Sequence, residues 1–397
     1  MKKIVLSALA ALTLGTVAAN AGVTKLYQDE NGQVFTKPAE GRTLIETPTS
    51  VFSKADKLKF SGLTYIGYKY NDYDKLGDDV TEKSSDSQFE IRRAYFQLKA
   101  YLLDDPKSYY RITFDVSKDV TGDEKVRAKY AYLYLNNILP ATGVEIGLAH
   151  RPWHDYEEHN SWYYRSISKV LVETKRAGDL SNSADFGIMT KTRTKYFEAD
   201  IGIFNGEGYH KYQRDNGMSF EWRTTAHLLG VSGKDKQESK TYFDASFYGQ
   251  LNQEHLTVNG SSEDMNFYGL HTVYNQPNFL VAAQYLDSHV NKVGGIASSK
   301  AGKGWSVNTE FRMGEEKEYK LLARYDFWTP EANDGDKEYD KKSYIIGAAW
   351  KQNRNVEWVA NATVKDYDKG ILPLTDTTQG ADSYNGVDYM LTAEVKF

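Results

Sequence analysis

The sequence predicts an all-β protein, a transmembrane antiparallel β-barrel of about sixteen strands. Three observations support this fold class. From Leu58 onward, apolar and polar side chains alternate in segments of about ten residues. Short turns and long polar connections alternate between these segments, and the last segment ends on an aromatic residue at the C-terminus. Each segment therefore has one face suited to lipid and one suited to water.

The composition is that of a β-rich chain. It has 30 Tyr against 8 Pro, and 14% of its residues are aromatic, which strands favour. It has no cysteine, which excludes a disulfide framework and thiolate metal or redox sites. Beyond residue 21 no apolar run approaches the roughly 18 residues that a membrane helix needs. No block of like charge indicates a nucleic-acid partner.

The N-terminus has the pattern of an export signal. Met1 is followed by two lysines, residues 4–19 are apolar, and Ala19-Asn20-Ala21 is the small-x-small pattern that signal peptidase cuts. We therefore expect a signal peptide at residues 1–21. A membrane anchor retained at this end is the weaker alternative.

Residues 22–57 are irregular and are expected to form a periplasmic leader. Asn31-Gly32 favours a type I′ turn and lies between two short apolar pairs, at residues 26–27 and 34–35. The leader is therefore predicted to contain a small hairpin, and a largely disordered leader is the alternative.

The clearest strands have an apolar residue at every second position. Residues at i, i+2 and i+4 share one face of a strand, and we expect this face to contact lipid. A soluble sandwich would alternate in the same way. The four clearest apolar faces are Val126-Ala128-Tyr130-Tyr132-Tyr134, Trp305-Val307-Thr309-Phe311-Met313, Tyr319-Leu321-Ala323-Tyr325-Phe327 and Val356-Trp358-Ala360-Ala362-Val364.

Connection lengths separate a barrel from a sandwich. Outer-membrane barrels have short periplasmic turns and long external loops, whereas a sandwich gives no reason for that asymmetry. The short connections are residues 104–107, 136–143, 192–194, 275–278, 314–318 and 352–355, with a less regular one at 232–239. The long ones are residues 71–87, 117–124, 151–183, 205–216, 252–264, 291–303, 329–340 and 368–384.

The last segment predicts closure of the barrel. Its apolar positions alternate up to the final residue, Phe397. A closed barrel must pair its last strand with its first, because an open edge in lipid leaves backbone groups unsatisfied. A terminal Phe on such a strand resembles the outer-membrane assembly signal.

Three further segments are distinctive: residues 89–94 (FEIRRA), 144–153 (VEIGLAHRPW) and 202–208 (GIFNGEG). In order and spacing they resemble the phosphate-selective porin O/P family of bacterial outer-membrane porins. With the strand pattern, the resemblance extends from Leu58 to Phe397. It implies a homotrimer of barrels whose third external loop folds into the lumen and constricts it. Here that loop is 151–183, which is also long enough for a functional role to be expected.

The polar faces of the strands predict the residues that line the lumen. Burying a basic residue in lipid costs about 2–4 kcal/mol at the midplane, so we expect Arg93, Lys99, Arg111, Arg127, Lys129, Arg223, Arg312 and Arg324 to face inward. Four of these come from consecutive strands and predict a basic patch, which acids of the inward loop would face. The alternative is that these residues are ordinary solvated side chains paired with neighbouring acids. Arg92 and Arg93 point to opposite faces unless one lies near an interface or the strand bulges.

The inward loop has balanced charge. Its basic residues are Arg151, Arg165, Lys169, Lys175 and Arg176, and its acids are Asp155, Glu157, Glu158, Glu173 and Asp179, five against five. A dedicated phosphate funnel would need a surplus of Arg or Lys, so the loop predicts a size filter with opposed charges. The predicted constriction and selectivity residues are Arg93, Arg111, Arg127, Lys129, Arg151, Asp155, Glu157, Glu158 and Arg165.

Two other chemistries are considered and set aside. His150, His154 and His159 lie near Asp155 and Glu158, but their spacing matches no established metal motif. Ser161 follows His159 and Asp155 without the geometry that a nucleophile requires, and no Gly-x-Ser-x-Gly motif occurs. We therefore expect no metal, no cofactor and no enzymatic activity.

Together these patterns predict a multi-pass porin in the outer membrane of a Gram-negative bacterium. Its expected partners are two further copies of itself, outer-membrane lipid and lipopolysaccharide. It would pass small hydrophilic solutes and ions with a modest preference for anions, including phosphate or other oxyanions. The competing class is an outer-membrane binding or adhesion barrel with functional external loops and a closed lumen.

Overall fold

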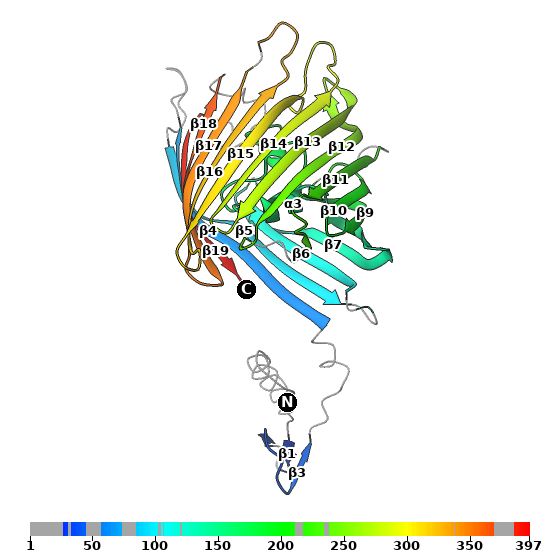
Figure 1. The fold of residues 1–397 in the computed structure, drawn as a ribbon, viewed down its shortest axis with the longest axis vertical. Coiled ribbons are helices and arrows are strands. Elements are labelled where there is room, and N and C mark those ends of the chain that lie inside the picture. Colours follow the sequence, from blue (N-terminus) through cyan, green and yellow to red (C-terminus); the bar gives the residue numbers. More distant parts are fainter. Residues whose placement is uncertain are drawn as a thin grey trace. The chain divides into compact units, whose positions relative to one another are not determined.

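The computed structural model describes residues 27–30, 33–44, 57–73, 85–101, 105, 107–119, 121–210, 217–233, 238–337, 339–368 and 385–397. The chain divides into two units, Met1–Asp56 and Lys57–Phe397. In the second unit, the sixteen strands β4 to β19 form a closed barrel (Figure 1). The predicted fold class, an all-β closed barrel of about sixteen strands, is confirmed. In the described part of the chain, no helix is long and apolar enough to cross a membrane.

The strands follow one another around the barrel in chain order, and every neighbouring pair is antiparallel. Their bounds are β4 (Leu58–Tyr73), β5 (Ser85–Tyr101), β6 (Tyr109–Lys118), β7 (Glu124–Leu139), β8 (Thr142–His150), β9 (Ala184–Arg193), β10 (Phe197–Phe204), β11 (Ser219–His227), β12 (Tyr242–Val258), β13 (Ser261–Gln276), β14 (Phe279–Val290), β15 (Gly302–Met313), β16 (Tyr319–Pro330), β17 (Lys341–Lys351), β18 (Val356–Tyr367) and β19 (Gly386–Lys396).

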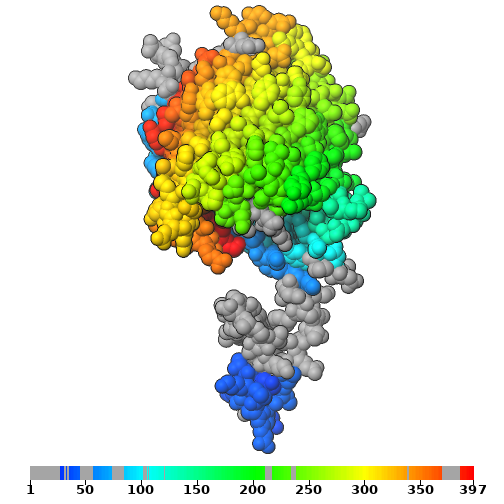
Figure 2. All heavy atoms as spheres, viewed as in Figure 1, coloured from blue at the N-terminus to red at the C-terminus, as the bar shows by residue number. Residues whose placement is uncertain are grey.

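Side chains alternate between the lumen and the outer surface of the barrel. Large apolar residues such as Phe220, Leu270 and Ile346 are exposed on the outside, whereas polar residues such as Asp244 and Thr363 are fully buried inside. The side chains of neighbouring strands form a continuous outer wall (Figure 2). Hydrocarbon satisfies no backbone polar group, so a closed barrel with an apolar exterior is a membrane-spanning structure, as in the outer membrane of Gram-negative bacteria.

The predicted closing strand pairs with the first strand, β4. The pairing continues to the last residue: the Gly62 amide donates to the Phe397 carbonyl at 2.9 Å, and the Phe397 amide donates to the Gly62 carbonyl at 3.1 Å. The Phe397 ring lies over Gly62, where a Cβ would come within 2.2 Å of it. A glycine is therefore required opposite the terminal aromatic residue.

A β-bulge in β5 explains the adjacent arginines. Tyr65 is opposite Arg93 while Ile66 is opposite Ile91, so Arg92 is an extra residue in the ladder. Both arginines consequently reach the lumen. Arg93 Nη1 lies 2.8 Å from Asp115 Oδ2, and Arg92 Nε lies 3.4 Å from Glu90 Oε1. Of the two possibilities predicted for this pair, the bulge is the one that occurs.

A second bulge corrects the predicted face of β7. Thr113 is opposite Tyr130 and Phe114 is opposite Ala128, so Lys129 is the extra residue. One added residue reverses the parity of a strand. Val126 is 66% exposed on the outside, whereas Tyr132 is 1% exposed in the lumen. The expectation that Val126, Ala128, Tyr130, Tyr132 and Tyr134 share the lipid face is therefore wrong beyond the bulge.

One expected long connection is a hairpin instead. Residues 252–264 continue β12 and β13 to a two-residue turn, Asn259-Gly260. Both turn residues have positive φ, 44° and 84°, as a type I′ turn requires. A register shift between Asn252 and Leu256 marks the bulge that interrupts this hairpin.

The first unit contains a small antiparallel sheet. Strand β1 (Tyr27–Asp29) pairs with β2 (Val34–Phe35) and with β3 (Arg42–Leu44). The sequence did not indicate the third strand. The turn of the predicted hairpin at residues 31–32 and the predicted signal peptide at residues 1–21 lie outside the described residues. The domain boundaries at residues 21 and 57 stay predictions.

Candidate functional site

The 151–183 connection between β8 and β9 lies in the lumen. It contains α3 (His154–Asn160) and η2 (Leu171–Glu173), and α3 is visible inside the ring of strands (Figure 1). Tyr156 Oη donates to Asp244 Oδ2 on β12 at 2.6 Å. Asn308 Nδ2 on β15 donates to the Ser161 carbonyl at 2.7 Å. These partners point inward, so the connection, called the inward loop below, is attached to that wall.

An apolar core holds the inward loop against strands β12 to β18. Trp153 stacks on Tyr248 with ring centroids 3.8 Å apart and planes 5° apart. The buried loop residues of this core are Trp153, Tyr156, Trp162, Tyr164, Ile167, Val170, Leu171, Val172, Ala177 and Leu180, and its barrel partners include Phe267, Leu286, Leu322, Trp328, Ile345 and Val359. This half of the lumen is packed like a protein interior.

Two predicted constriction residues stabilise the loop and do not face the open lumen. Arg151 is 2% exposed, and its guanidinium lies 3.1 Å from Asp185 and 3.2 Å from Glu221 on the wall. Glu157 is 1% exposed and accepts hydrogen bonds from Trp153 Nε1 at 2.7 Å and Gln284 Nε2 at 2.6 Å. Glu157 therefore points away from the basic patch that it was expected to face.

Burial changes the acidity of Glu157 on α3. It raises the pKa of this carboxyl group to about 7, although the charge of Arg324 and the two donors named above favour the carboxylate. A buried carboxyl group that is half protonated near neutral pH makes the packing of the loop sensitive to pH.

Two cavities of the lumen lie beside β4 to β7 and β19, and a smaller one, of about 110 Å³, lies between α3 and strands β8 to β11. The upper cavity, of about 440 Å³, reaches Lys69 on β4 and Asp388 on β19, toward the strand ends that carry the long connections. The lower cavity, of about 320 Å³, reaches Ser61 on β4 and Lys396 on β19, toward the short turns. Tyr65 and Arg165 line both cavities. The two cavities therefore meet at these residues, and this boundary is called the narrow point below.

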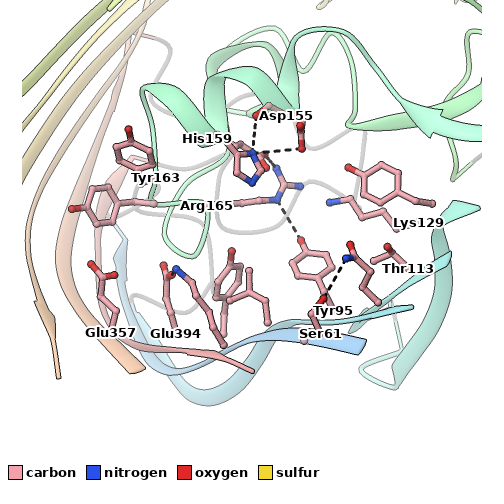
Figure 3. A pocket seen from close by; sticks show the side chains of 18 of the residues that line it. Ser61, Tyr95, Thr113, Lys129, Asp155, His159, Tyr163, Arg165, Glu357 and Glu394 are labelled. Atoms are coloured by element: carbon pink, nitrogen blue, oxygen red, sulfur yellow. Dashed lines mark hydrogen bonds and ion pairs between the residues drawn. The ribbon is translucent and has the colours of Figure 1, made fainter. Parts of the chain in front are cut away.

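Arg165 extends from the inward loop to the barrel wall at this boundary. Its Nε donates to Tyr95 Oη at 3.3 Å, as Figure 3 shows. Its Nη1 pairs with Glu158 and lies 2.7 Å from Glu173 Oε2. Burial alone would raise the pKa of Glu173, but Arg165 and Lys169 hold it well below its usual value. The loop thus presents a fixed cation, held by carboxylates, opposite a tyrosine hydroxyl.

The two cavities differ in charge. The upper cavity is lined by two acids, Glu90 and Asp388, and by nine basic residues: Lys69, Arg92, Arg93, Lys118, Arg127, Arg165, Lys169, Lys175 and Arg176. The lower cavity is lined by five acids, Asp155, Glu158, Glu238, Glu357 and Glu394, and by five basic residues, Arg111, Lys129, Arg165, Lys320 and Lys396. The cationic surplus of the lumen is thus concentrated in the upper cavity.

The predicted residues divide between these cavities. Arg93 and Arg127 line the upper cavity, while Arg111, Lys129, Asp155 and Glu158 line the lower one. The single basic patch expected from consecutive strands is therefore split between two levels. Counting the charge of the loop by itself could not reveal the surplus in the upper cavity, because four basic residues of the loop and none of its acids line this cavity, together with five basic residues of the strands.

Three of the basic residues in the upper cavity have no counter-ion in the described part of the chain. Lys69, Lys118 and Arg127 line the cavity and form no ion pair with a described carboxylate. Lys69 and Lys118 were not predicted as site residues. The alternation of β4 carries a signal for Lys69, which has the inward parity of its strand. Lys118 has the outward parity of β6 and lines the cavity from the end of that strand, so alternation gave no signal for it.

The residues considered for metal binding and hydrolysis come together only in part: His150 Nε2 and His159 Nδ1 lie 3.7 Å and 3.5 Å from Asp155 Oδ1. Ser161 is buried and lies 3.1 Å from His271 Nε2 of β13. His159 instead lies 2.8 Å from the Asp155 carbonyl oxygen through its Nδ1. Among the described residues, no group of three or more His, Cys, Asp and Glu side chains is placed to hold a metal ion. The hydrolase arrangement is therefore not formed.

Neither a protein-family model nor a curated protein sequence matches the chain. Solved structures do. An anion-selective porin from Comamonas acidovorans superposes with a TM-score of 0.61 at 12% identity, covering 85% of this chain and 98% of that one. OmpT from Vibrio cholerae in a trimer form gives 0.55 at 14%, covering 86% and 99%. OmpF from Salmonella typhi in complex with daunomycin gives 0.57 at 10%, covering 86% and 97%. The chain thus has the fold of bacterial outer-membrane porins.

Proposed function

We propose that the chain forms an outer-membrane diffusion channel for small hydrophilic solutes and ions, with a preference for anions. The observation that carries this proposal is the upper cavity, with nine basic and two acidic residues above the narrow point. A cavity lined by one sign of charge concentrates counter-ions, and basic residues along a pore favour anions. Phosphate and other oxyanions are among the anions that such a cavity attracts.

The narrow point supplies contacts to a passing anion. The Arg165 guanidinium is always charged. Its Nε donates to Tyr95, its Nη1 to Glu158 and Glu173, and its Nη2 to Glu173, which leaves one Nη2 hydrogen for the oxygen of a passing anion. Tyr95 places a hydroxyl group opposite it. Glu158 and Glu173 fix the guanidinium on the loop, so solutes must pass a rigid group and not a mobile side chain. This contact sets the size limit.

Reversal potentials in a salt gradient across a planar bilayer test the anion preference. We expect anion selectivity in the wild type and a shift toward cations when Lys69 and Arg127 are both replaced by Glu, because neither has a described carboxylate partner to lose. Lys107→Glu, on an exposed turn, is the matched control and should leave the potential unchanged. A cation-selective wild type would overturn the proposal.

We also propose that the barrel works as a homotrimer surrounded by lipid and lipopolysaccharide. The sequence resemblance to phosphate-selective porins implies this assembly. OmpT of V. cholerae, which has a similar fold, has a structure in a trimer form. Conductance that appears in groups of three equal steps would support the trimer. Steps that appear singly at all protein concentrations would contradict it.

The second candidate is an outer-membrane binding or adhesion protein with a closed lumen. One observation favours it: the apolar core between the inward loop and strands β12 to β18 fills that half of the barrel. Conductance in a planar bilayer separates the two functions. Stable ion-conducting steps support the channel, and reconstituted barrels that never conduct support the closed alternative.

A further inference from the structure

One wall of the lower cavity carries a buried lysine that no carboxylate of the described residues neutralises. Lys129 is 4% exposed, and its ammonium group lies 4.6 Å from the centroid of the Tyr95 ring and 5.3 Å from that of Tyr130. It forms no ion pair with a carboxylate among the described residues. Lys129 is also the extra residue of the β7 bulge, and bulges re-aim side chains near functional sites.

Arg111 extends the positive end of this cavity. Its hydrogen-bonding partners are Thr113 Oγ1 at 3.1 Å, Tyr132 Oη at 3.3 Å and His150 Nε2 at 3.1 Å, and the charge of Asp155 acts on it from the same cavity. Lys129 has no such carboxylate among the described residues, and a buried charge without an opposite charge is costly. A carboxylate placed between Lys129 and Arg111 would lower that cost.

The facing wall carries an excess of negative charge. Lys320 pairs with Glu238 at 3.4 Å and with Glu357 at 3.1 Å, and Lys396 lies 3.6 Å from Glu394. Arg312 also reaches Glu238, at 4.0 Å, but is paired with Glu310. Four carboxylates thus share two ammonium groups and one guanidinium. Glu394 is 4% exposed, and its Oε1 has no hydrogen-bond partner among the described residues. An ammonium group at this wall would provide one.

The two ends lie on opposite sides of one cavity. In Figure 3, Glu357 and Glu394 are on one side and Lys129 is on the other, with Tyr95 and Arg165 between them. The space between the walls is lined by five tyrosines, Tyr65, Tyr95, Tyr130, Tyr163 and Tyr164. The volume of about 320 Å³ is at the lower end of the range for small-molecule sites.

We infer that the lower cavity is a binding site for small zwitterions of the amino-acid class, an inference that rests on the proposed channel function. The carboxylate of the solute lies toward Lys129 and Arg111, its ammonium group toward Glu394, and its side chain among the tyrosine rings. A pure anion or cation of the same size is attracted at one end and repelled at the other. The upper cavity therefore selects by net charge, and the lower cavity selects by the separation of charges.

Liposome swelling with the reconstituted full-length mature protein tests this inference. The probes are glutamine, a zwitterion, and arabinose, a neutral solute of similar mass. We expect glutamine to enter about fivefold faster than arabinose at low solute concentration, the size of effect expected for one charge pair in contact with water. Glu394→Gln should reduce the ratio toward one. Glu90→Gln makes the same chemical change in the upper cavity and should leave the ratio unchanged.

A second variant removes the opposite end of the site. Lys129→Met deletes the uncompensated buried charge while keeping a similar shape, so it should fold, and it should also lower the ratio of glutamine to arabinose entry. An equal entry rate for the two solutes in the wild type overturns the inference, as does a ratio that neither variant changes. These failures are distinct from failure of the proposed channel, in which neither arabinose nor chloride would pass.

Discussion

Arg165 is the residue on which the proposed selectivity depends most directly. Replacing it by Gln removes the cation at the narrow point and the contact with Tyr95. We expect a larger single-channel conductance and an anion-to-cation permeability ratio reduced by about fivefold, the Coulomb effect of one charge close to a solute in water. Arg165→Lys keeps the charge and should retain most of the anion preference. Unchanged conductance and selectivity in Arg165→Gln would show that solutes pass elsewhere.

Glu157 gives the channel an expected pH dependence. Its pKa is raised from 4.5 to about 7 in the folded loop, so the packed loop favours the protonated form. The attachment of the loop is therefore strongest below pH 4.5, weakens between pH 4.5 and pH 7, and is weakest above pH 7. The free energy that holds the loop differs by on the order of 3 kcal/mol between the strongest and the weakest state.

Open-channel current noise measures this effect. We expect noise to increase from about pH 5 to about pH 8 in the wild type, because a loosened loop fluctuates more. In Glu157→Gln, which is neutral at every pH, the noise should be low throughout. Equal pH dependence in the two proteins would mean that another group controls the loop.

At the scale of elements, the inward loop depends on its apolar core. Trp153→Ala removes the ring that stacks on Tyr248, and deletion of a large buried aromatic side chain costs about 3–5 kcal/mol. We expect cleavage of the inward loop by protease in the reconstituted protein, together with noisy conductance. Trp350→Ala, on the outer surface at 44% exposure, is the matched control and should resist. If the inward loop of Trp153→Ala resists protease, the polar contacts alone hold the loop in place.

The elements also show what the sequence could and could not predict. Strand rhythm and turn chemistry are local, so the strands and their closure by Phe397 were predictable. A bulge depends on the pairing with the neighbouring strand, which alternation along one strand does not show. The sequence therefore did not predict that the Tyr130 and Tyr132 side chains face the lumen after the bulge at Lys129. The packing of the loop depends on apolar residues that face inward, such as Tyr248. Alternation alone cannot separate such residues from those that face lipid.

At the scale of the whole molecule, charge is distributed by level along the channel. The inward loop is balanced by itself, and so is the lower cavity. The surplus arises where Lys69 of β4, Lys118 of β6 and Arg127 of β7 meet the loop at the upper level. These strands lie on one side of the barrel, with β5 between β4 and β6, but the height of each residue along the barrel depends on the register of the strands. The sequence shows which residues are charged but not the height of each one along the barrel. It therefore predicted that basic residues line this side of the lumen, but not that the upper cavity has more positive charge than the lower one.

This asymmetry predicts rectification. With nine basic and two acidic residues at one level and five of each at the other, ions meet different fields from the two ends. At about 0.1 M salt the Debye length is about 10 Å, and at about 1 M it is about 3 Å. We expect current–voltage curves that are asymmetric at low salt and symmetric at high salt. Channels inserted in opposite directions should give mirror-image curves at low salt. Lys69→Glu combined with Arg127→Glu should weaken the asymmetry at low salt. Symmetric curves at low salt, or asymmetry that persists at high salt, would contradict an electrostatic origin in the upper cavity.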